Sequence, residues 1–313
     1  MSRTLLLAED PFGDLVSHAL LAELGAAPNA PPLLVAGASA PLPHGFEALP
    51  EAEDPRALDI RHIILGGVFL DRARLEAMLA LALRIDAKLT LYRFGVEGAA
   101  AQRPAPAGAA VLERATAITL RDHRSANVLT YWRVHARFAI EPFPERHVAP
   151  DPALANLLPP GPVLGLALRD GGDMRASWQP RLPAIRRLLA GAIGWPVLPL
   201  PIRGPGQSGD DLAGSTAFAQ AVFTTPRFLM PRLGDFAWWR REVTPARMKG
   251  LVARCTLVVT NRDLVAAYAV ASGVKVQGIS LGADRRIVSC LATLANELPE
   301  GSDLAHPLPG PFR

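Results

Sequence analysis

The chain has 313 residues, and half of them are hydrophobic, which is enough for two ordinary domains with sizeable cores. Its formal net charge is only +4 and no long block of basic residues occurs, so the charge pattern excludes a typical nucleic-acid binder. The mild positive excess would suit an anionic small substrate or an anionic membrane surface.

Cysteine and histidine usage indicates neither a disulfide framework nor a metal site. Cys255 and Cys290 lie in apolar segments without metal-ligand spacing, as is typical of a reducing compartment. The seven histidines show no paired ligand spacing either. The first apolar run is too short for a signal peptide core, and no stretch has the roughly 18 apolar residues of a membrane span. We therefore expect a soluble cytoplasmic protein without a metal or a resident cofactor.

Short apolar runs alternate with helical patterns through the first half of the chain. Helical patterns cover 14–24, which ends at Gly25, and 75–85. The apolar runs predict strands at 4–7, 31–36, 62–65, 89–94 and 117–120. This alternation favours βα units and a mostly parallel sheet.

A proline-rich seam between 147 and 162 separates this series from a second one. Beyond the seam, strands are predicted at 163–168, 197–201, 257–260 and 274–279. Helices are predicted at 182–192, 244–253, 263–271 and 285–298, with Thr244 as an N-cap and Pro245 at the first helical position. The sequence thus predicts an α/β domain over 1–150, a second over 151–298 and a proline-rich tail over 299–313.

In open parallel sheets, ligands collect beyond the carboxyl ends of the strands, so residues just after the predicted strands are the first candidates for chemistry. In the first domain these are Gly13 and Asp14, followed by the glycine pair Gly66 and Gly67. Glycine lets the backbone turn tightly or approach a ligand closely. Asp14 could equally serve only as a helix N-cap.

Two more candidates follow in the same way. Arg121 comes directly after the strand predicted at 117–120, where Asp122 and Ser125 could be no more than the first residues of a helix. Asp151 lies between two prolines, a setting that is often a plain turn.

The second domain delivers an arginine at the end of each of two predicted strands. Arg169 follows 163–168, and Arg262 follows 257–260 with Asp263 beside it at the start of a helix. An arginine fork matches a carboxylate or a phosphate through two parallel hydrogen bonds, and a helix N-terminus favours the same anion. Two such arginines facing one cleft would suit a small substrate that bears both groups. The alternative is a pair of surface or salt-bridged arginines.

Taken in order, these segments resemble the polysaccharide pyruvyl transferase family over roughly residues 9–295. In the first half the resemblance rests on Phe-Gly-Asp at 12–14, the Gly-Gly turn, Phe-Gly-Val-Glu-Gly at 94–98, Arg-Asp-x-x-Ser from 121 and Asp-Pro-Ala-Leu from 151. In the second half it rests on Leu-Arg at 168–169, Asp-Asp at 210–211 and the run 253–262, which leads into an alanine-rich helix.

The resemblance implies two Rossmann-like domains facing a cleft in a GT-B-like architecture. It also implies an enzyme that transfers pyruvate from phosphoenolpyruvate, as a ketal, to sugar hydroxyls of a bacterial exopolysaccharide or cell-surface glycan. The acceptor would be a lipid-linked oligosaccharide or glycan, met at the inner face of the cytoplasmic membrane, and phosphoenolpyruvate would be the donor substrate. The implied catalytic residues are Asp14 and Arg262, and the implied substrate-binding residues are Gly13, Gly66, Gly67, Arg121, Asp151, Arg169 and Asp263.

The chain departs from the family where the acid/base is expected. The family usually reads Arg-Leu-His at the start of the alanine-rich helix, whereas this chain reads Arg262-Asp263-Leu264, and leucine cannot transfer a proton. Either Asp14, His123 or Asp263 takes over that step, or the activity has been lost or changed. Asp14, entering from the facing domain, is the candidate that we favour, as a base.

Two other functions are open. One is a GT-B glycosyltransferase that uses a nucleotide sugar and holds the diphosphate at helix N-termini of the second domain. The other is a catalytically inactive family member that scaffolds a polysaccharide assembly complex. The missing histidine is the observation that favours this alternative.

Overall fold

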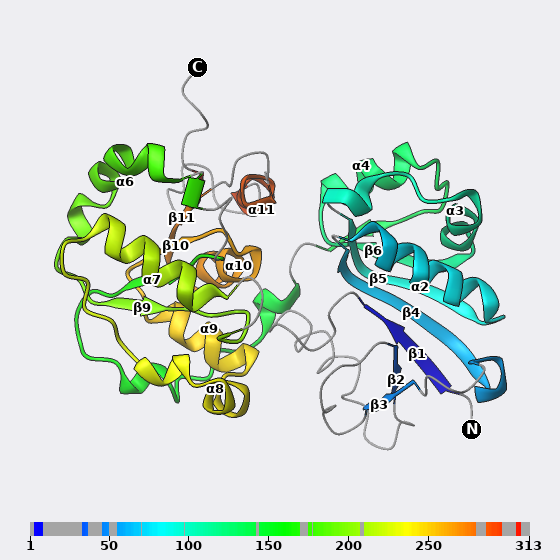
Figure 1. Cartoon of the computed structure of the whole chain (residues 1–313), viewed down its shortest axis with the longest axis horizontal. Helices are drawn as coiled ribbons and strands as arrows, with labels where there is room; N and C mark the ends of the chain where they lie inside the picture. The colour runs from blue at the N-terminus through cyan, green and yellow to red at the C-terminus, as the bar shows by residue number, and fades with distance from the viewer. Residues whose placement is uncertain are drawn as a thin grey trace. The chain divides into compact units, whose positions relative to one another are not determined.

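The computed structural model describes residues 3–8, 33–36, 46–49, 55–69, 71–96, 98–141, 144–169, 175–176, 178–206, 210–279, 286–295 and 305–307. The chain divides into two compact units, Met1–Pro142 and Phe143–Arg313, so the division falls shortly before the proline-rich seam at 147–162 and the domain boundary predicted between residues 150 and 151. Each unit is built around one sheet, in which the registers found between neighbouring strands are parallel (Figure 1). The predicted helix at 14–24 lies outside the described residues.

The sheet of the first unit has the strand order β3-β2-β1-β4-β5-β6-β7. Its strands are β1 (Arg3–Leu7), β2 (Leu33–Val35), β3 (Phe46–Ala48), β4 (Ile60–Phe69), β5 (Lys88–Val96), β6 (Ala115–Leu120) and β7 (Ala139–Ile140). Its helices are α2 (Arg72–Arg84), α3 (Pro106–Glu113) and α4 (His123–Tyr131), with 3₁₀ turns η1 (Pro55–Leu58) and η2 (Gly98–Ala101).

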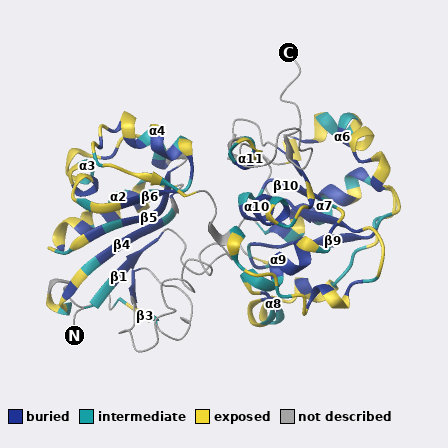
Figure 2. Cartoon of the chain, turned by 180° about the vertical axis from the view of Figure 1, so that it is seen from behind, coloured by how far each residue is buried: buried dark blue, intermediate teal, exposed yellow. Residues whose placement is uncertain are grey.

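Both faces of this sheet carry apolar side chains. Leu5 and Leu7 of β1 belong to the large core that includes residues of α2, α3 and α4, whereas Leu6, between them, packs with Val35 and Ile64 on the opposite face. Successive side chains of a strand point to opposite faces, which accounts for this alternation. A sheet that is apolar on both faces is typical of parallel α/β folds, and Figure 2 shows buried residues concentrated along the strands.

The sheet of the second unit has the strand order β12-β11-β10-β8-β9. Its strands are β8 (Leu164–Ala167), β9 (Val197–Pro199), β10 (Leu257–Thr260), β11 (Lys275–Gly278) and β12 (Ala305–Pro307). Its helices are α6 (Leu182–Leu188), α7 (Asp211–Val222), α8 (Phe236–Glu242), α9 (Pro245–Ala253), α10 (Asp263–Ala271) and α11 (Arg286–Ala295). Short 3₁₀ turns are η3 (Pro144–His147), η4 (Ala155–Leu157), η5 (Gln179–Arg181), η6 (Ala190–Ala192) and η7 (Pro231–Gly234).

Several predicted elements are confirmed, and others differ for clear reasons. Thr244 caps α9 by accepting a hydrogen bond from Arg247 N at 3.2 Å, and Pro245 opens the helix. The glycine pair at 66–67 was expected to be a turn, but β4 continues through it to Phe69 because β5 pairs with it on both sides of the glycines. Part of the predicted tail forms β12, an edge strand beside β11, and an edge tolerates its Pro307.

The proline-rich seam is fixed to α9 by a close backbone contact at Asp151. Asp151 N donates to Ala246 O at 2.9 Å, and a Cβ at Gly250 would lie 2.1 Å from Asp151 O. The Asp151 carboxylate accepts from Ala153 N at 2.9 Å and from Arg247 Nε at 3.1 Å. Arg247 also donates to Glu242 Oε2 at 2.8 Å. Asp151, expected to bind substrate, thus has a set of structural partners.

We expect this ion-pair cluster to make unit 2 lose stability in acid. Hydrogen bonds from Ala153 and Arg247 hold the pKa of Asp151 below its ordinary 3.8, and hydrogen bonds from Arg241 and Arg247 hold the pKa of Glu242 below 4.5. A carboxyl group whose pKa is lower in the folded than in the unfolded protein stabilises the fold at any pH above its unfolded-state pKa. This stabilisation is lost as the pH falls through the pKa of the folded state. The urea midpoint of the wild type should therefore exceed that of Asp151→Asn at pH 6. This advantage should shrink towards pH 3, and a difference that stays constant would contradict the assignment.

No helix among the described residues is long and apolar enough to cross a membrane. Within the same described ranges, no group of three histidine, cysteine or acidic side chains could hold a metal ion.

Candidate functional site

The carboxyl ends of two neighbouring strands bring Arg169 and Arg262 to equivalent positions of the second sheet. Ala167 of β8 pairs with Thr260 of β10, and each arginine lies two residues beyond its member of that pair. The two strand ends are also joined by a hydrogen bond from Arg169 N to Asn261 Oδ1, 3.1 Å long. The prediction that both arginines come from strand ends of one domain is confirmed, and they leave the sheet at the same edge.

Arg262 is engaged by a buried carboxylate that the sequence did not single out as its partner. Its Nε lies 2.7 Å and its Nη2 2.6 Å from Asp211 Oδ1, and Asp211 is fully buried. The other oxygen of Asp211 accepts hydrogen bonds from Ile202 N at 2.9 Å and from Arg203 N at 3.0 Å. A buried charge needs this many partners to offset its desolvation. Arg262 is therefore salt-bridged, one of the two alternatives that the sequence left open.

The first turns of α7 supply this carboxylate and the groups around it. Asp210 is the N-cap and accepts from Leu212 N at 2.7 Å, so that Asp211, one residue later, starts the helix. Ser215, one turn further along, accepts from Leu168 N and donates to Leu166 O, both at 3.1 Å. The side chains of α7 thus satisfy backbone groups at the carboxyl end of β8.

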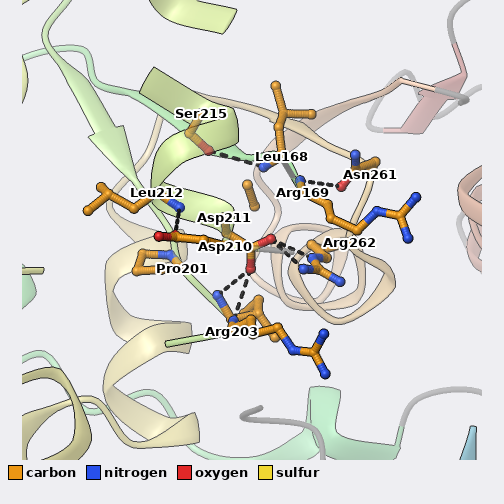
Figure 3. A network of polar contacts seen from close by, with 12 residues as sticks. Leu168, Arg169, Pro201, Arg203, Asp210, Asp211, Leu212, Ser215, Asn261 and Arg262 are labelled. Atoms are coloured by element: carbon orange, nitrogen blue, oxygen red, sulfur yellow. Dashed lines mark hydrogen bonds and ion pairs between the residues drawn. The ribbon is translucent and has the colours of Figure 1, made fainter. Parts of the chain in front are cut away.

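A third arginine, Arg203, follows the carboxyl end of β9, the strand next to β8. Its loop is held from two sides. Besides the bonds to Asp211, Trp239 Nε1 donates to Pro201 O at 3.1 Å, and the Phe236 ring packs so tightly on Gly204 that an added Cβ would lie 2.5 Å from it. In Figure 3 the side chains of Arg169 and Arg203 extend away from the Asp211 carboxylate, whereas the Arg262 guanidinium faces it.

The helix that follows Arg262 starts without a side-chain cap. Arg262 occupies the N-cap position of α10 with no capping hydrogen bond from its side chain, and its N–H donates to Thr260 Oγ1 at 2.8 Å. Leu264, where the pyruvyl transferase pattern has its histidine, is only 3 % exposed and is a core residue of α10. Asp263 is half-buried in the first turn.

The described candidates of the first unit lie within or directly after its strands. Gly67 adopts a φ of 83° at a register shift between β4 and β5, a conformation that favours glycine. Arg121 follows β6, with its Nε 3.8 Å from Asp122 Oδ2, and Asp122 caps α4 through Ser125 N at 2.6 Å. The helix-start interpretation of Asp122 is thereby confirmed. Gly13 and Asp14 lie outside the described residues.

Arg93 of β5 is a buried arginine that the sequence did not indicate as a candidate site residue. It is 7 % exposed, has a φ of 49° within β5, and its guanidinium lies 4.9 Å from the Tyr92 ring centroid. The only signal in the sequence is an arginine within an apolar strand.

Comparison with solved structures identifies the fold. The chain is similar to a crystal structure described as a UDP-N-acetylglucosamine 2-epimerase from Listeria monocytogenes, with a TM-score of 0.52, 11 % identity, and coverage of 91 % of this chain and 81 % of that chain. A structure of MnaA from S. aureus with UDP has a TM-score of 0.46 and 11 % identity over 90 % of this chain and 79 % of that one. No protein-family model and no curated protein sequence matches. The fold is α/β with two Rossmann-like domains, as in GT-B-like enzymes.

Proposed function

We propose that the chain is a GT-B-fold enzyme that acts on a nucleotide sugar and binds the donor's phosphates at the carboxyl edge of the second sheet. The observation that carries this proposal is the pair Arg169 and Arg262 at equivalent ends of the paired strands β10 and β8. Rossmann-like sheets bind ligands outside this edge. Guanidinium groups are the side chains best suited to phosphate oxygens.

The ion pair with Asp211 determines how the Arg262 guanidinium is presented to a ligand. Its Nε and Nη2 face Asp211, and its side chain is 20 % exposed. A guanidinium held in this way is oriented before a ligand arrives, which reduces the entropy lost on binding. The N-terminus of α10 directs partial positive charge to the same strand end.

Pyruvyl transfer from phosphoenolpyruvate is the second candidate. It is favoured by the motif order and by the match of two arginines to one carboxylate and one phosphate. It is weakened by Leu264, because a buried apolar side chain stands where proton transfer is required. The likeness of the fold to a structure described as a UDP-N-acetylglucosamine 2-epimerase supports the nucleotide sugar over phosphoenolpyruvate in this proposal.

Binding measurements separate these functions. Titration calorimetry of the wild type with UDP, UDP-N-acetylglucosamine and phosphoenolpyruvate should show binding of the UDP compounds. Arg169→Ala should weaken that binding about ten-fold or more, because it removes a charge-assisted hydrogen-bond donor. The matched control is Arg187→Ala, since Arg187 is an exposed arginine of α6.

Binding of phosphoenolpyruvate alone would reject the nucleotide sugar in favour of pyruvyl transfer. Pyruvate transfer to a lipid-linked acceptor by the wild type and by Leu264→His would then show whether the missing histidine limits the reaction. If the wild type binds none of the three compounds, both enzymatic functions are rejected. The non-catalytic scaffold of an assembly complex is then the remaining alternative.

A further inference from the structure

The structure assigns a role in ligand binding to Arg203: together with Arg169 and Arg262 it forms a three-arginine row that fits a diphosphate. This inference rests on the proposed function and specifies the group that the site recognises. The sheet order β10-β8-β9 places the three arginines behind three consecutive strands. Neither the strand pattern nor the family resemblance had indicated Arg203.

Asp211 joins two of the three arginines. It accepts from the Arg203 backbone through one oxygen and from the Arg262 guanidinium through the other. Arg169 is tied to the same strand end through its backbone N–H, which donates to Oδ1 of Asn261, the residue before Arg262. The single carboxylate of Asp211 therefore sets the position of the Arg203 loop relative to Arg262, as the close view in Figure 3 shows.

The described part of the loop that carries Arg203, residues 200–206, is held by contacts from α7 and α8. Trp239 donates to Pro201 O, the Phe236 ring covers Gly204, and Gly206 N donates to Asp210 Oδ2 at 2.8 Å. Trp239 itself is 2 % exposed, and its ring stacks with that of Phe236 at a centroid distance of 6.2 Å. These contacts from α7 and α8 hold the backbone that carries Arg203 in place, which limits the entropy lost when a ligand binds. The side chain of Arg203 is half-buried, so it remains accessible to a ligand.

The size of the row indicates the size of the ligand. Neighbouring strands lie about 4.8 Å apart, so three consecutive strand ends span about 10 Å. That span exceeds a single phosphate or phosphoenolpyruvate, which two adjacent arginines would saturate. It fits the two linked phosphates of a nucleoside diphosphate sugar, with Arg262 and Arg203, behind the outer two of the three strands, contacting different phosphates and Arg169 lying between them.

The test compares ligands that carry one and two phosphates. In titration calorimetry, Arg203→Ala should weaken UDP and UDP-N-acetylglucosamine about ten-fold or more and leave UMP within about two-fold of the wild type. Arg203→Lys keeps the charge without the planar fork, so its affinity for UDP should lie between that of the wild type and that of Arg203→Ala. Both variants retain the backbone N–H that Asp211 uses, and matching circular dichroism and urea midpoints would show that the fold is intact. Arg187→Ala is again the control.

The outcomes distinguish this inference from the function on which it rests. If the wild type binds UDP compounds and Arg169→Ala weakens them while Arg203→Ala does not, the role of Arg203 is overturned and the proposed function stands. Equal weakening of UMP and UDP by Arg203→Ala would overturn the diphosphate assignment. A wild type that binds no UDP compound would overturn the proposed function, and this inference with it.

Discussion

Asp211→Ala is expected to lower the free energy of unfolding of unit 2 by about 3–5 kcal/mol, the cost of removing one partner from a buried ion pair. The substitution leaves the Arg262 guanidinium without its carboxylate and the Ile202 and Arg203 N–H groups without their acceptor. Each such loss costs free energy because water cannot replace the missing partner in the interior. Asp211 is fully buried, so little solvent screening offsets the effect.

Urea unfolding followed by tryptophan fluorescence would measure this effect, because all the tryptophans except Trp132 belong to unit 2. Asp210→Ala is the matched control. It removes the neighbouring carboxylate, which caps α7 and accepts from Gly206 N in an exposed hydrogen bond, and the loss should cost only about 1 kcal/mol. Equal losses in the two variants would show that the Asp211 carboxylate acts merely as part of the helix start.

Gly250→Ala is expected to destabilise unit 2 by about 1–3 kcal/mol, the usual cost of forcing an extra group into a packed site. In the interior of a helix such as α9, replacing glycine by alanine ordinarily stabilises by about 0.5–1 kcal/mol. Here the new Cβ would lie 2.1 Å from Asp151 O and 2.9 Å from Asp151 C. Both are backbone atoms, so a side-chain rotation cannot relieve the clash.

The same urea experiment would test this prediction. Gly191→Ala, where an added Cβ meets no atom within 4 Å, should leave the midpoint nearly unchanged. If Gly250→Ala proved neutral or stabilising, the contact between α9 and the segment at Asp151 would have to be looser than the structure shows.

The sequence determined several of the local elements and the placement of two arginines. β10 and α10 have the predicted bounds of 257–260 and 263–271, because a short apolar run and a helical pattern with a clear start are local signals. Arg169 and Arg262 were identified because strand ends in parallel sheets are functional positions, a rule that needs only the order of strands along the chain. The division into two α/β units follows likewise from a proline-rich seam between two series of strands.

Only the tertiary structure decided what these arginines contact and what stands beside them. Asp211 lies 51 residues from Arg262, and their ion pair exists because α7 starts at the edge where β10 ends. Arg203 is a candidate only because β9 lies next to β8 in the sheet. Partners this far apart in sequence are set by strand order and by packing between elements. No local pattern encodes either, which is why the sequence could place Arg262 at a strand end and could not show that a buried carboxylate holds it.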